Sequence, residues 1–381
     1  MVIGRTGRLM LFALGFGASF MIVASLTEIS TLSRERARTA AFVEAVLERL
    51  EFRRTRPPEK VKGIYLPAAV AGNTARRAQL LALADETELN AMVIDLKDSY
   101  GRVSYASSVS QTKQPDLTYV YIRDLPGLVR ELRAHRIWPI ARLPVFQDTA
   151  FAEARPHLAV KSKEVGSIWR DRKGLAWVDP ASPEAWDYNI ALAREAFALG
   201  FGEVQFDYIR FPSDGKIVDM VFPVWDENRP QHQVMADFFA YARRELGEKA
   251  VLSADLFGMT LLRTDKPDDD LGIGQRLVDA VPYFDYISPM VYPSHYPPTF
   301  RGFANPAAHP GEVVAYSIQS GTPAFEGTRA KVRPWLQDFD LGARYTADMV
   351  RAQIGASDAN GGMGWLLWNP AGRYTEEALL K

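Results

Sequence analysis

Between residue 61 and the carboxyl terminus, short apolar runs alternate with helical patterns, and eight such runs occur. A short apolar run bounded by glycine, proline or polar residues predicts a buried strand. Strands that alternate with helices predict a parallel sheet covered by helices, and eight of them over about 300 residues fit a (β/α)8 barrel. The sequence therefore predicts an α/β fold, a TIM barrel that spans residues 61–381. The expected strands are residues 61–67, 91–97, 137–143, 203–210, 250–256, 284–291, 331–338 and 363–368.

Helix boundaries fit this alternation. Ser182 is a capping residue before the first-turn Pro183, and Gly200 follows the last position of an apolar stripe, so a helix is expected between them. A second helix is expected to end at Gly247. Residues 312–320 could form a strand or a helix. We interpret them as a helix, because this keeps the number of strands at eight.

The first 27 residues differ from the rest of the chain. Arg5 and Arg8 precede an uncharged apolar run over residues 9–26, whose 18 residues suit either a long signal peptide or a short membrane anchor. Positive charge before the run would place the bulk of the chain outside the cytoplasm. We expect an exported protein that is anchored in the membrane and faces the periplasm or the extracellular side, or that is secreted if residues 1–27 are cleaved. Residues 28–60 are charged and alanine-rich and are expected to form a helical stalk or linker.

The composition excludes several kinds of site. The chain has no cysteine, which rules out disulfides, thiolate metal ligands and thiol nucleophiles. It has five histidines, no two of them at the spacing of a metal motif, so neither a metal nor another cofactor is expected. No Gly-x-Ser-x-Gly motif of a triad hydrolase occurs. The formal net charge of −1 argues against a nucleic-acid partner, because such proteins usually carry a marked basic excess.

Two aspartates stand out at the expected strand ends. Asp207 lies in an otherwise apolar run, where a lone buried charge would be costly. At the carboxyl end of a barrel strand it would instead face the mouth, where barrels of this kind carry their chemistry. Asp255 occupies the equivalent place on the fifth strand. Glycoside hydrolysis needs one carboxylate as nucleophile or base and a second, protonated carboxyl as general acid, and we predict that Asp207 and Asp255 are this pair.

Other residues near the strand ends could complete a sugar site. Flat aromatic faces suit pyranose rings, and amides and carboxylates suit sugar hydroxyls. Lys97 could contact substrate or form a salt bridge, and Arg210 could orient Asp207 or belong to a structural ion pair. Asp98 and Asp338 could equally be caps of backbone groups. The candidate substrate-binding residues are Asp95, Lys97, Asp98, Arg210, Tyr292, His295, Trp335, Gln337, Asp338, Trp368 and Asn369.

Five sequence blocks occur in order along the chain. They are Val61-Lys-Gly-Ile-Tyr, Val93-Ile-Asp-Leu-Lys-Asp98, Gln205-Phe-Asp-Tyr-Ile-Arg-Phe-Pro212, Asp285-Tyr-Ile-Ser-Pro-Met-Val-Tyr292 and Pro334-Trp-Leu-Gln-Asp-Phe339. Together they resemble an uncharacterised bacterial family described as a glycosyl hydrolase domain and distantly related to α-amylase-type barrels. The resemblance covers about residues 61–374, and it implies a (β/α)8 fold and a glycan substrate.

The resemblance also implies roles for individual residues. Asp207 matches the fourth-strand nucleophile of α-amylase-type barrels, and Asp338 is similar to their seventh-strand stabilising aspartate. Those enzymes carry a glutamate as acid/base where this chain has Asp255, and a histidine where it has Gln337. The shorter acid could widen the distance between the two carboxyl groups from about 5 Å toward the roughly 6.5–9.5 Å of inverting enzymes.

We therefore predict a glycoside hydrolase that acts on a poly- or oligosaccharide of the cell envelope or the extracellular space. Three alternatives remain, and one of them is a scaffold with no glycan site, which an exposed groove without clustered carboxylates would favour. A non-catalytic glycan-binding protein of the envelope would use the same groove without turnover. A polysaccharide deacetylase would normally need a metal held by histidine and aspartate, and the scattered histidines argue against it.

Overall fold

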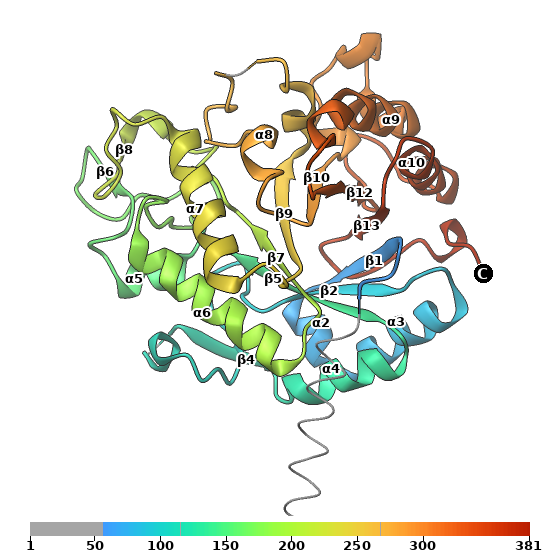
Figure 1. Cartoon of the computed structure of the whole chain (residues 1–381), viewed down its shortest axis with the longest axis horizontal. Coiled ribbons are helices and arrows are strands. Elements are labelled where there is room, and N and C mark those ends of the chain that lie inside the picture. Colours follow the sequence, from blue (N-terminus) through green and yellow to red (C-terminus); the bar gives the residue numbers. More distant parts are fainter. Residues whose placement is uncertain (1–55, 115, 267) are drawn as a thin grey trace, which may run out of the picture. The chain divides into compact units, whose positions relative to one another are not determined.

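Eight strand positions close into a parallel barrel in the part of the chain that the computed structural model describes, residues 56–114, 116–266 and 268–381 (Figure 1). Each strand position of the barrel pairs in parallel with the barrel positions before and after it. Pairing of the first with the last strand, and of β9 with β10, closes the ring, so the predicted (β/α)8 fold is confirmed. The barrel strands are β1 (Val61–Leu66), β2 (Ala91–Asp95), β5 (Trp138–Pro144), β7 (Glu203–Asp207), β9 (Leu252–Phe257), β10 (Tyr286–Met290), β11 (Lys331–Val332) with β12 (Trp335–Gln337), and β13 (Gly364–Trp368).

The seventh strand position is divided, whereas the sequence predicts one strand over residues 331–338. β11 and β12 both pair with β10 and are separated by Arg333 and Pro334. Proline has no N–H to donate to a ladder, so a strand is easily interrupted there. The Pro334 carbonyl still accepts a hydrogen bond from the N–H of Leu366 at 2.9 Å, which keeps β13 attached across the break.

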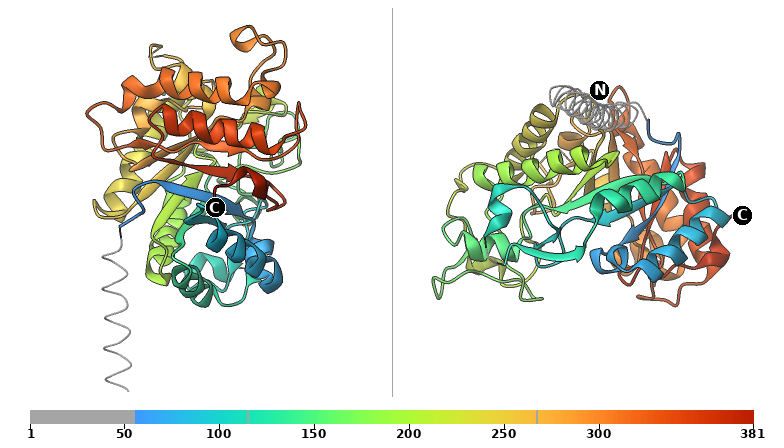
Figure 2. Two further views of the ribbon diagram at one scale, coloured as in Figure 1. Left: turned by 90° about the vertical axis from the view of Figure 1, so that its right-hand side faces the viewer. Right: turned by 90° about the horizontal axis from the view of Figure 1, so that it is seen from below.

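Helices cover the outside of the barrel (Figure 2). α6 begins where Ser182 Oγ accepts the N–H of Ala185 and ends at Gly200, whose φ of 111° suits glycine, as the sequence predicts. α9 confirms that residues 312–320 are helical, and it packs beside α10. Between β9 and β10 the described residues form only short helical turns. The helices are α2 (Ala68–Gly72), α3 (Thr74–Glu86), α4 (Leu125–Ala134), α5 (Thr149–Ala154), α6 (Pro183–Leu199), α7 (Gln231–Leu246), α8 (Leu277–Ala280), α9 (Pro310–Gly321) and α10 (Ala347–Ala359).

The long connections on the carboxyl side of the barrel are structured. β3 (Val103–Tyr105) pairs with β4 (Thr118–Ile122) between β2 and α4. β6 (Lys161–Ser162), in the loop after β5, pairs antiparallel with β8 (Met220–Val221), in the loop after β7. The Asp179 carboxylate joins the same two loops, because its Oδ2 accepts the N–H groups of Val224 and Trp225 at 2.7 and 2.9 Å. The loops after β5 and β7 are therefore bound to each other.

An ion pair fills the lower part of the barrel interior. Glu203 begins β7 and is fully buried, and its carboxylate accepts hydrogen bonds from the Arg333 guanidinium at 2.5 and 3.1 Å. Ser253 Oγ and Trp138 Nε1 donate to the same carboxylate at 2.5 and 3.2 Å. Every oxygen of Glu203 is thus satisfied, which buried charge requires. This layer closes the barrel beneath the aspartates at the strand ends.

The predicted signal or anchor segment, residues 1–27, lies outside the described residues, as does nearly all of the predicted stalk, residues 28–60. Within the described ranges, the helices are too short or too polar to span a lipid bilayer.

Candidate active site

Three aspartates and one arginine meet at the carboxyl ends of four consecutive barrel strands. Asp95 ends β2, Arg142 lies near the end of β5, Asp207 ends β7, and Asp255 lies in β9. Arg142 and Asp95 are direct partners in the β2–β5 register, so both side chains point to the same side of the sheet. The Arg142 guanidinium reaches all three carboxylates. We call these four residues the carboxylate cluster.

Asp207 is held from two sides. Its Oδ2 accepts hydrogen bonds from Arg142 Nε at 3.0 Å and Nη2 at 2.5 Å, and its Oδ1 accepts the N–H of Tyr208 at 2.6 Å. The last contact forms because the strand ends at Asp207 and Tyr208 adopts a left-handed φ of 51°. The sequence predicts a strand that continues to residue 210, which is wrong by three residues. Both oxygens of Asp207 therefore accept hydrogen bonds, and those from the buried Arg142 guanidinium are charge-assisted.

Asp255 lies in a different environment, although the same arginine is nearby. Its side chain is 1% exposed, and its Oδ1 accepts a hydrogen bond from Trp335 Nε1 at 2.8 Å. Its Oδ2 receives no hydrogen bond from the described residues, and the nearest cation atom is Arg142 Nε at 3.9 Å. Burial, followed by the negative charge of Asp207, raises the pKa of Asp255 well above its ordinary value. A carboxyl group in this environment keeps its proton to higher pH, as a general acid must.

Asp95 completes the carboxylate cluster. It accepts a hydrogen bond from Arg142 Nη1 at 2.6 Å and another from the Tyr65 hydroxyl. Burial raises the pKa of Asp95, although the Arg142 charge opposes this. The Tyr65 ring stacks on Trp368 at a centroid distance of 4.0 Å, and Trp368 is half-buried at the mouth. Trp368 therefore lies where a flat ring could meet a sugar.

Residues 63–374 match the model of a family described as "Putative glycosyl hydrolase domain". The chain belongs to this family. The resemblance to this family and the predicted enzyme class, glycoside hydrolase, are thereby confirmed at the level of the family. A search of curated proteins found no match to this glycosyl hydrolase domain.

Three solved structures place the family's barrel in context. The PgaB (BpsB) glycoside hydrolase domain from Bordetella bronchiseptica has 13% identity and a TM-score of 0.59 over 85% of this chain and 99% of that one. The alpha-L-fucosidase isoenzyme 2 from Paenibacillus thiaminolyticus has 11% identity and a TM-score of 0.56 over 84% and 48%. A hypothetical protein from Ruminiclostridium thermocellum has 36% identity over 50% of this chain and 96% of that one, with a TM-score of 0.46. At their low identities, the first two establish a shared fold.

Arg142 is the member of the carboxylate cluster that the sequence analysis missed. It is 5% exposed and bonds two aspartates that lie 47 and 65 residues away in the chain. The signal was present, because a charged residue in the middle of an apolar barrel strand is as unusual as Asp207 in its strand. Arg142 also takes the role that the sequence analysis offered to Arg210. Arg210 instead donates to the Phe211 carbonyl and to Ser213 Oγ, each at 3.0 Å.

Lys97 and Asp98 make structural contacts outside the carboxylate cluster. Lys97 is 0% exposed, and its ammonium contacts Asp148 Oδ2 at 2.5 Å and the Pro144 carbonyl at 2.7 Å. Asp98 accepts the N–H groups of Tyr100 and Arg102 and pairs with the Arg102 guanidinium at 2.8 Å. For these two residues the structure favours the salt-bridge and capping interpretations over substrate contact.

Three candidates after β12 and β13 hold loops together. Asp338 accepts the N–H and the hydroxyl of Thr375 at 2.9 and 2.7 Å, and its own carbonyl accepts Asn369 Nδ2 at 2.6 Å. Gln337 is fully buried, and its side chain bonds the Phe339 carbonyl and the N–H of Ser294. The structure does not bring these side chains to Arg142 as it does the other aspartates.

Tyr292, His295 and Trp335 come from the sixth and seventh strand positions. Burial, followed by the charges of Asp255 and Asp207, raises the pKa of Tyr292. The His295 ring is 5.3 Å from that of Tyr292 and is exposed at the rim, and partial burial lowers its pKa. Trp335 is buried and acts on the site through its hydrogen bond to Asp255.

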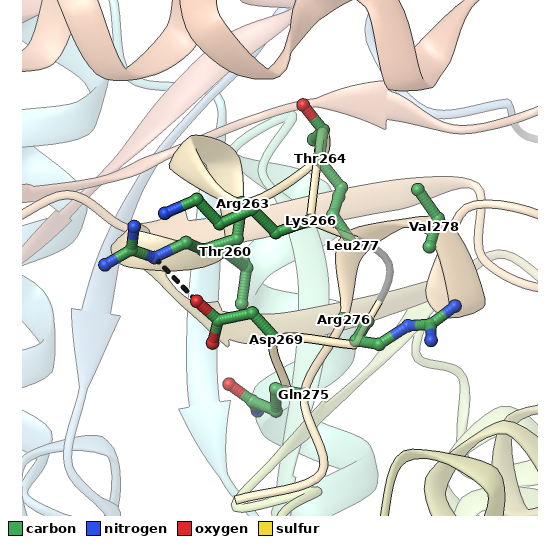
Figure 3. Close-up of a pocket in the computed structure, with 9 residues that line it drawn as sticks. All are labelled: Thr260, Arg263, Thr264, Lys266, Asp269, Gln275, Arg276, Leu277 and Val278. Carbon is green, nitrogen blue, oxygen red and sulfur yellow. Dashed lines mark ion pairs between the residues drawn. The ribbon is translucent and has the colours of Figure 1, made fainter. Parts of the chain in front are cut away.

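A separate pocket lies within the connection between β9 and β10 (Figure 3). Asp269 is the acidic residue in its wall, and it pairs with Arg263 Nε at 3.2 Å. Among the described residues that line it there is no second carboxylate, whereas the carboxylate cluster holds the pair that acid/base chemistry needs. Its lining residues are Thr260, Arg263, Thr264, Lys266, Asp269, Gln275, Arg276, Leu277 and Val278.

Proposed function

We propose that this protein hydrolyses a glycosidic bond with Asp207 as nucleophile or general base and Asp255 as general acid. The observation that carries the proposal is the unequal environment of the two carboxyl groups beside Arg142. Two guanidinium N–H groups stabilise negative charge on Asp207, while burial and the Asp207 charge raise the pKa of Asp255. Pairs of carboxyl groups whose environments separate their protonation states are typical of acid/base division in glycosidases.

The proposed reaction transfers one proton from Asp255 and uses Asp207 as nucleophile or base. Asp255 Oδ2, which has no donor among the described residues, would pass its proton to the glycosidic oxygen as the bond to the anomeric carbon breaks. Asp207 would either attack that carbon, forming a glycosyl ester that water then hydrolyses, or take a proton from an attacking water. In both routes one water is consumed and both carboxyl groups return to their starting states. Arg142 positions Asp207 and balances its charge.

The contacts of Arg142 set an upper limit on the distance between the two carboxyl groups. Arg142 Nε is 3.0 Å from Asp207 Oδ2 and 3.9 Å from Asp255 Oδ2. The two oxygens therefore lie within about 7 Å of each other, a limit that admits the retaining spacing of about 5 Å and the lower end of the inverting range. The configuration of the first-formed product, followed by NMR, distinguishes the two routes.

Burial sets a condition on the proposal. Asp255 is 1% and Asp207 6% exposed, so a sugar reaches them only if side chains at the mouth move aside. Active-site loops commonly open and close on substrate. Saturating glycan should therefore change hydrogen exchange in the loops after β5, β7 and β10.

We further propose a poly- or oligosaccharide of the cell envelope or the extracellular space as substrate. The support is the apolar run over residues 9–26, which favours export and attachment to a membrane unless it is cleaved. Half-buried Trp368 at the mouth adds a surface of the kind that sugar rings contact.

The test compares three isosteric substitutions in the full chain: Asp207→Asn, Asp255→Asn and the control Asp338→Asn. A panel of bacterial envelope and plant oligosaccharides is assayed for new reducing ends, and binding is measured by calorimetry. We expect the first two variants to lose at least about 100-fold in turnover while they still bind glycan, and the control to keep most activity. Full turnover by Asp207→Asn would exclude the assigned chemistry, and binding by the parent without turnover would favour a non-catalytic glycan-binding protein.

A further inference from the structure

Tyr208 has an unusual backbone conformation at the carboxylate cluster. Strand alternation would send its side chain to the outside of the barrel, opposite to Asp207. The strand ends at Asp207 instead, and Tyr208 has a φ of 51°. The left-handed region is disfavoured for bulky residues and is natural for glycine. The other described non-glycine residues with positive φ lie in turns and loops away from the carboxylate cluster: Asp116, Arg136, Leu271, Thr299 and Arg301.

Neighbouring groups hold Tyr208 in this conformation. Its N–H donates to Asp207 Oδ1 at 2.6 Å, and its carbonyl accepts the N–H of Phe146 at 3.3 Å. Its ring meets the buried Trp177 edge-on at a centroid distance of 5.9 Å. The Arg210 guanidinium lies 5.2 Å from the same ring and 4.8 Å from that of Trp177. The aromatic side chain is therefore fixed and oriented, not merely tolerated.

The hydroxyl of Tyr208 is available for a ligand. It forms no hydrogen bond with the described residues, and the side chain is half-buried. Burial and then the charge of Asp207 raise the pKa of Tyr208, and Arg142 and Asp95 also act on it. Tyr208 also follows Asp207 directly in the chain, so its backbone lies beside the carboxylate cluster. Because the described residues supply no partner, this half-buried hydroxyl can donate to a water or to a ligand that enters the site.

We propose that Tyr208 is a substrate-binding residue whose hydroxyl hydrogen-bonds a hydroxyl group of the sugar ring placed between Asp207 and Asp255. This rests on the proposed function, because it needs a sugar at that position. Backbone strain that a glycine would relieve, at a residue whose neighbours fix its ring, is typical of functional positions. In this proposal the Asp207 carboxylate and the Tyr208 hydroxyl would contact the same sugar, and the hydrogen bond from the Tyr208 N–H to Asp207 Oδ1 would couple their positions.

The test separates side chain from backbone. Tyr208→Phe removes only the hydroxyl, and Tyr208→Gly removes the ring while it suits the left-handed backbone. Arg136→Gly is the matched control, since Arg136 has a φ of 59° and is exposed in the turn between α4 and β5. Affinity for an oligosaccharide from the panel is measured by calorimetry in the Asp207→Asn background, where turnover plays no part. KM and kcat are measured in the otherwise unchanged enzyme.

We expect Tyr208→Phe to weaken binding about five- to tenfold, and Tyr208→Gly to weaken it further without a lower melting temperature. Arg136→Gly should bind as the parent does. Parent-like affinity in Tyr208→Phe overturns the proposal, because that variant lacks only the hydroxyl, while loss of turnover in Asp207→Asn would leave the proposed function standing. The reverse result, weakened binding in a protein without turnover, keeps Tyr208 as a glycan contact and removes the hydrolase. If the parent binds no glycan of the panel, both are wrong.

Discussion

Replacement of Arg142 by methionine is expected to destabilise the fold strongly and in a pH-dependent way. Methionine matches much of the arginine stem but removes the cation that bonds Asp95 and Asp207. The three side chains are 5–6% exposed, so water cannot replace the lost donors. Removing one partner of a buried ion pair typically costs about 3–5 kcal/mol, and we expect Arg142→Met to lose this much free energy of unfolding at pH 8.

The pH dependence follows from the remaining carboxyl groups. Arg142 lowers the pKa of Asp95 and of Asp255, in each case against the larger effect of burial. Without it, both pKa values rise further above those of the unfolded chain. The folded state then keeps protons that the unfolded chain has released, so the free energy of unfolding falls as the pH rises through that window. The deficit of Arg142→Met should be largest at pH 8 and smallest near the ordinary aspartate pKa of about 3.9.

Urea unfolding followed by circular dichroism at pH 5 and pH 8 measures both effects. Asp95→Asn in the Arg142→Met background serves as the second variant, because it removes one of the uncompensated charges and should recover part of the lost stability at pH 8. Arg333→Met, which breaks the buried pair with Glu203 away from the carboxylate cluster, gives the cost of such a loss elsewhere in this barrel. A deficit below about 1 kcal/mol, or one equal at both pH values, would refute the reasoning.

Three further outcomes test other contacts. Trp335→Phe removes the donor to Asp255 Oδ1, and this hydrogen bond lowers the pKa of Asp255. The basic limb of the kcat/KM profile should therefore move to higher pH. A move to lower pH would contradict the assignment of Asp255 as general acid. Lys97→Met leaves Asp148 buried without its ammonium partner and should lower the free energy of unfolding, measured in urea, by about 3–5 kcal/mol. Unchanged stability with a raised KM would instead indicate that Lys97 contacts substrate. Asp338→Ala removes both acceptors of Thr375 and should cost about 1–3 kcal/mol while both limbs of the pH profile stay in place, and a shifted limb would make Asp338 part of the catalytic group.

The sequence predicts the barrel well because the fold depends on a repeated local pattern. Each buried strand needs a short apolar run, and each helix needs a stripe and a cap, so α6 can be recognised from Ser182 and Gly200 alone. The strand ends also locate Asp207 and Asp255 correctly at one mouth. Strand alternation gives the wrong side-chain direction just beyond Asp207, because it assumes that the strand continues. The strand ends at Asp207, and Tyr208 adopts a left-handed backbone conformation.

The partners of each polar side chain are harder to predict, because they depend on contacts between distant segments. Arg142 and Asp207 are 65 residues apart, and nothing near either residue in the sequence names the other. Asp338 and Lys97 sit at strand ends just as Asp207 does, yet Thr375 and Asp148 satisfy them. A position at a strand end therefore identifies candidate site residues. The hydrogen-bond partners in the structure then distinguish structural residues from candidate catalytic ones.

The joining of β6 to β8, reinforced by Asp179, has a practical consequence for altering specificity. Two stretches of chain at the entrance, each long enough to be exchanged alone, share a ladder and a buried carboxylate. Replacing only one of these two loops with the loop of a homologous barrel would remove the hydrogen bonds that it makes to the other loop. Engineers who wish to widen or narrow the entrance should exchange the two as a single cassette, and substrate admission should displace them together.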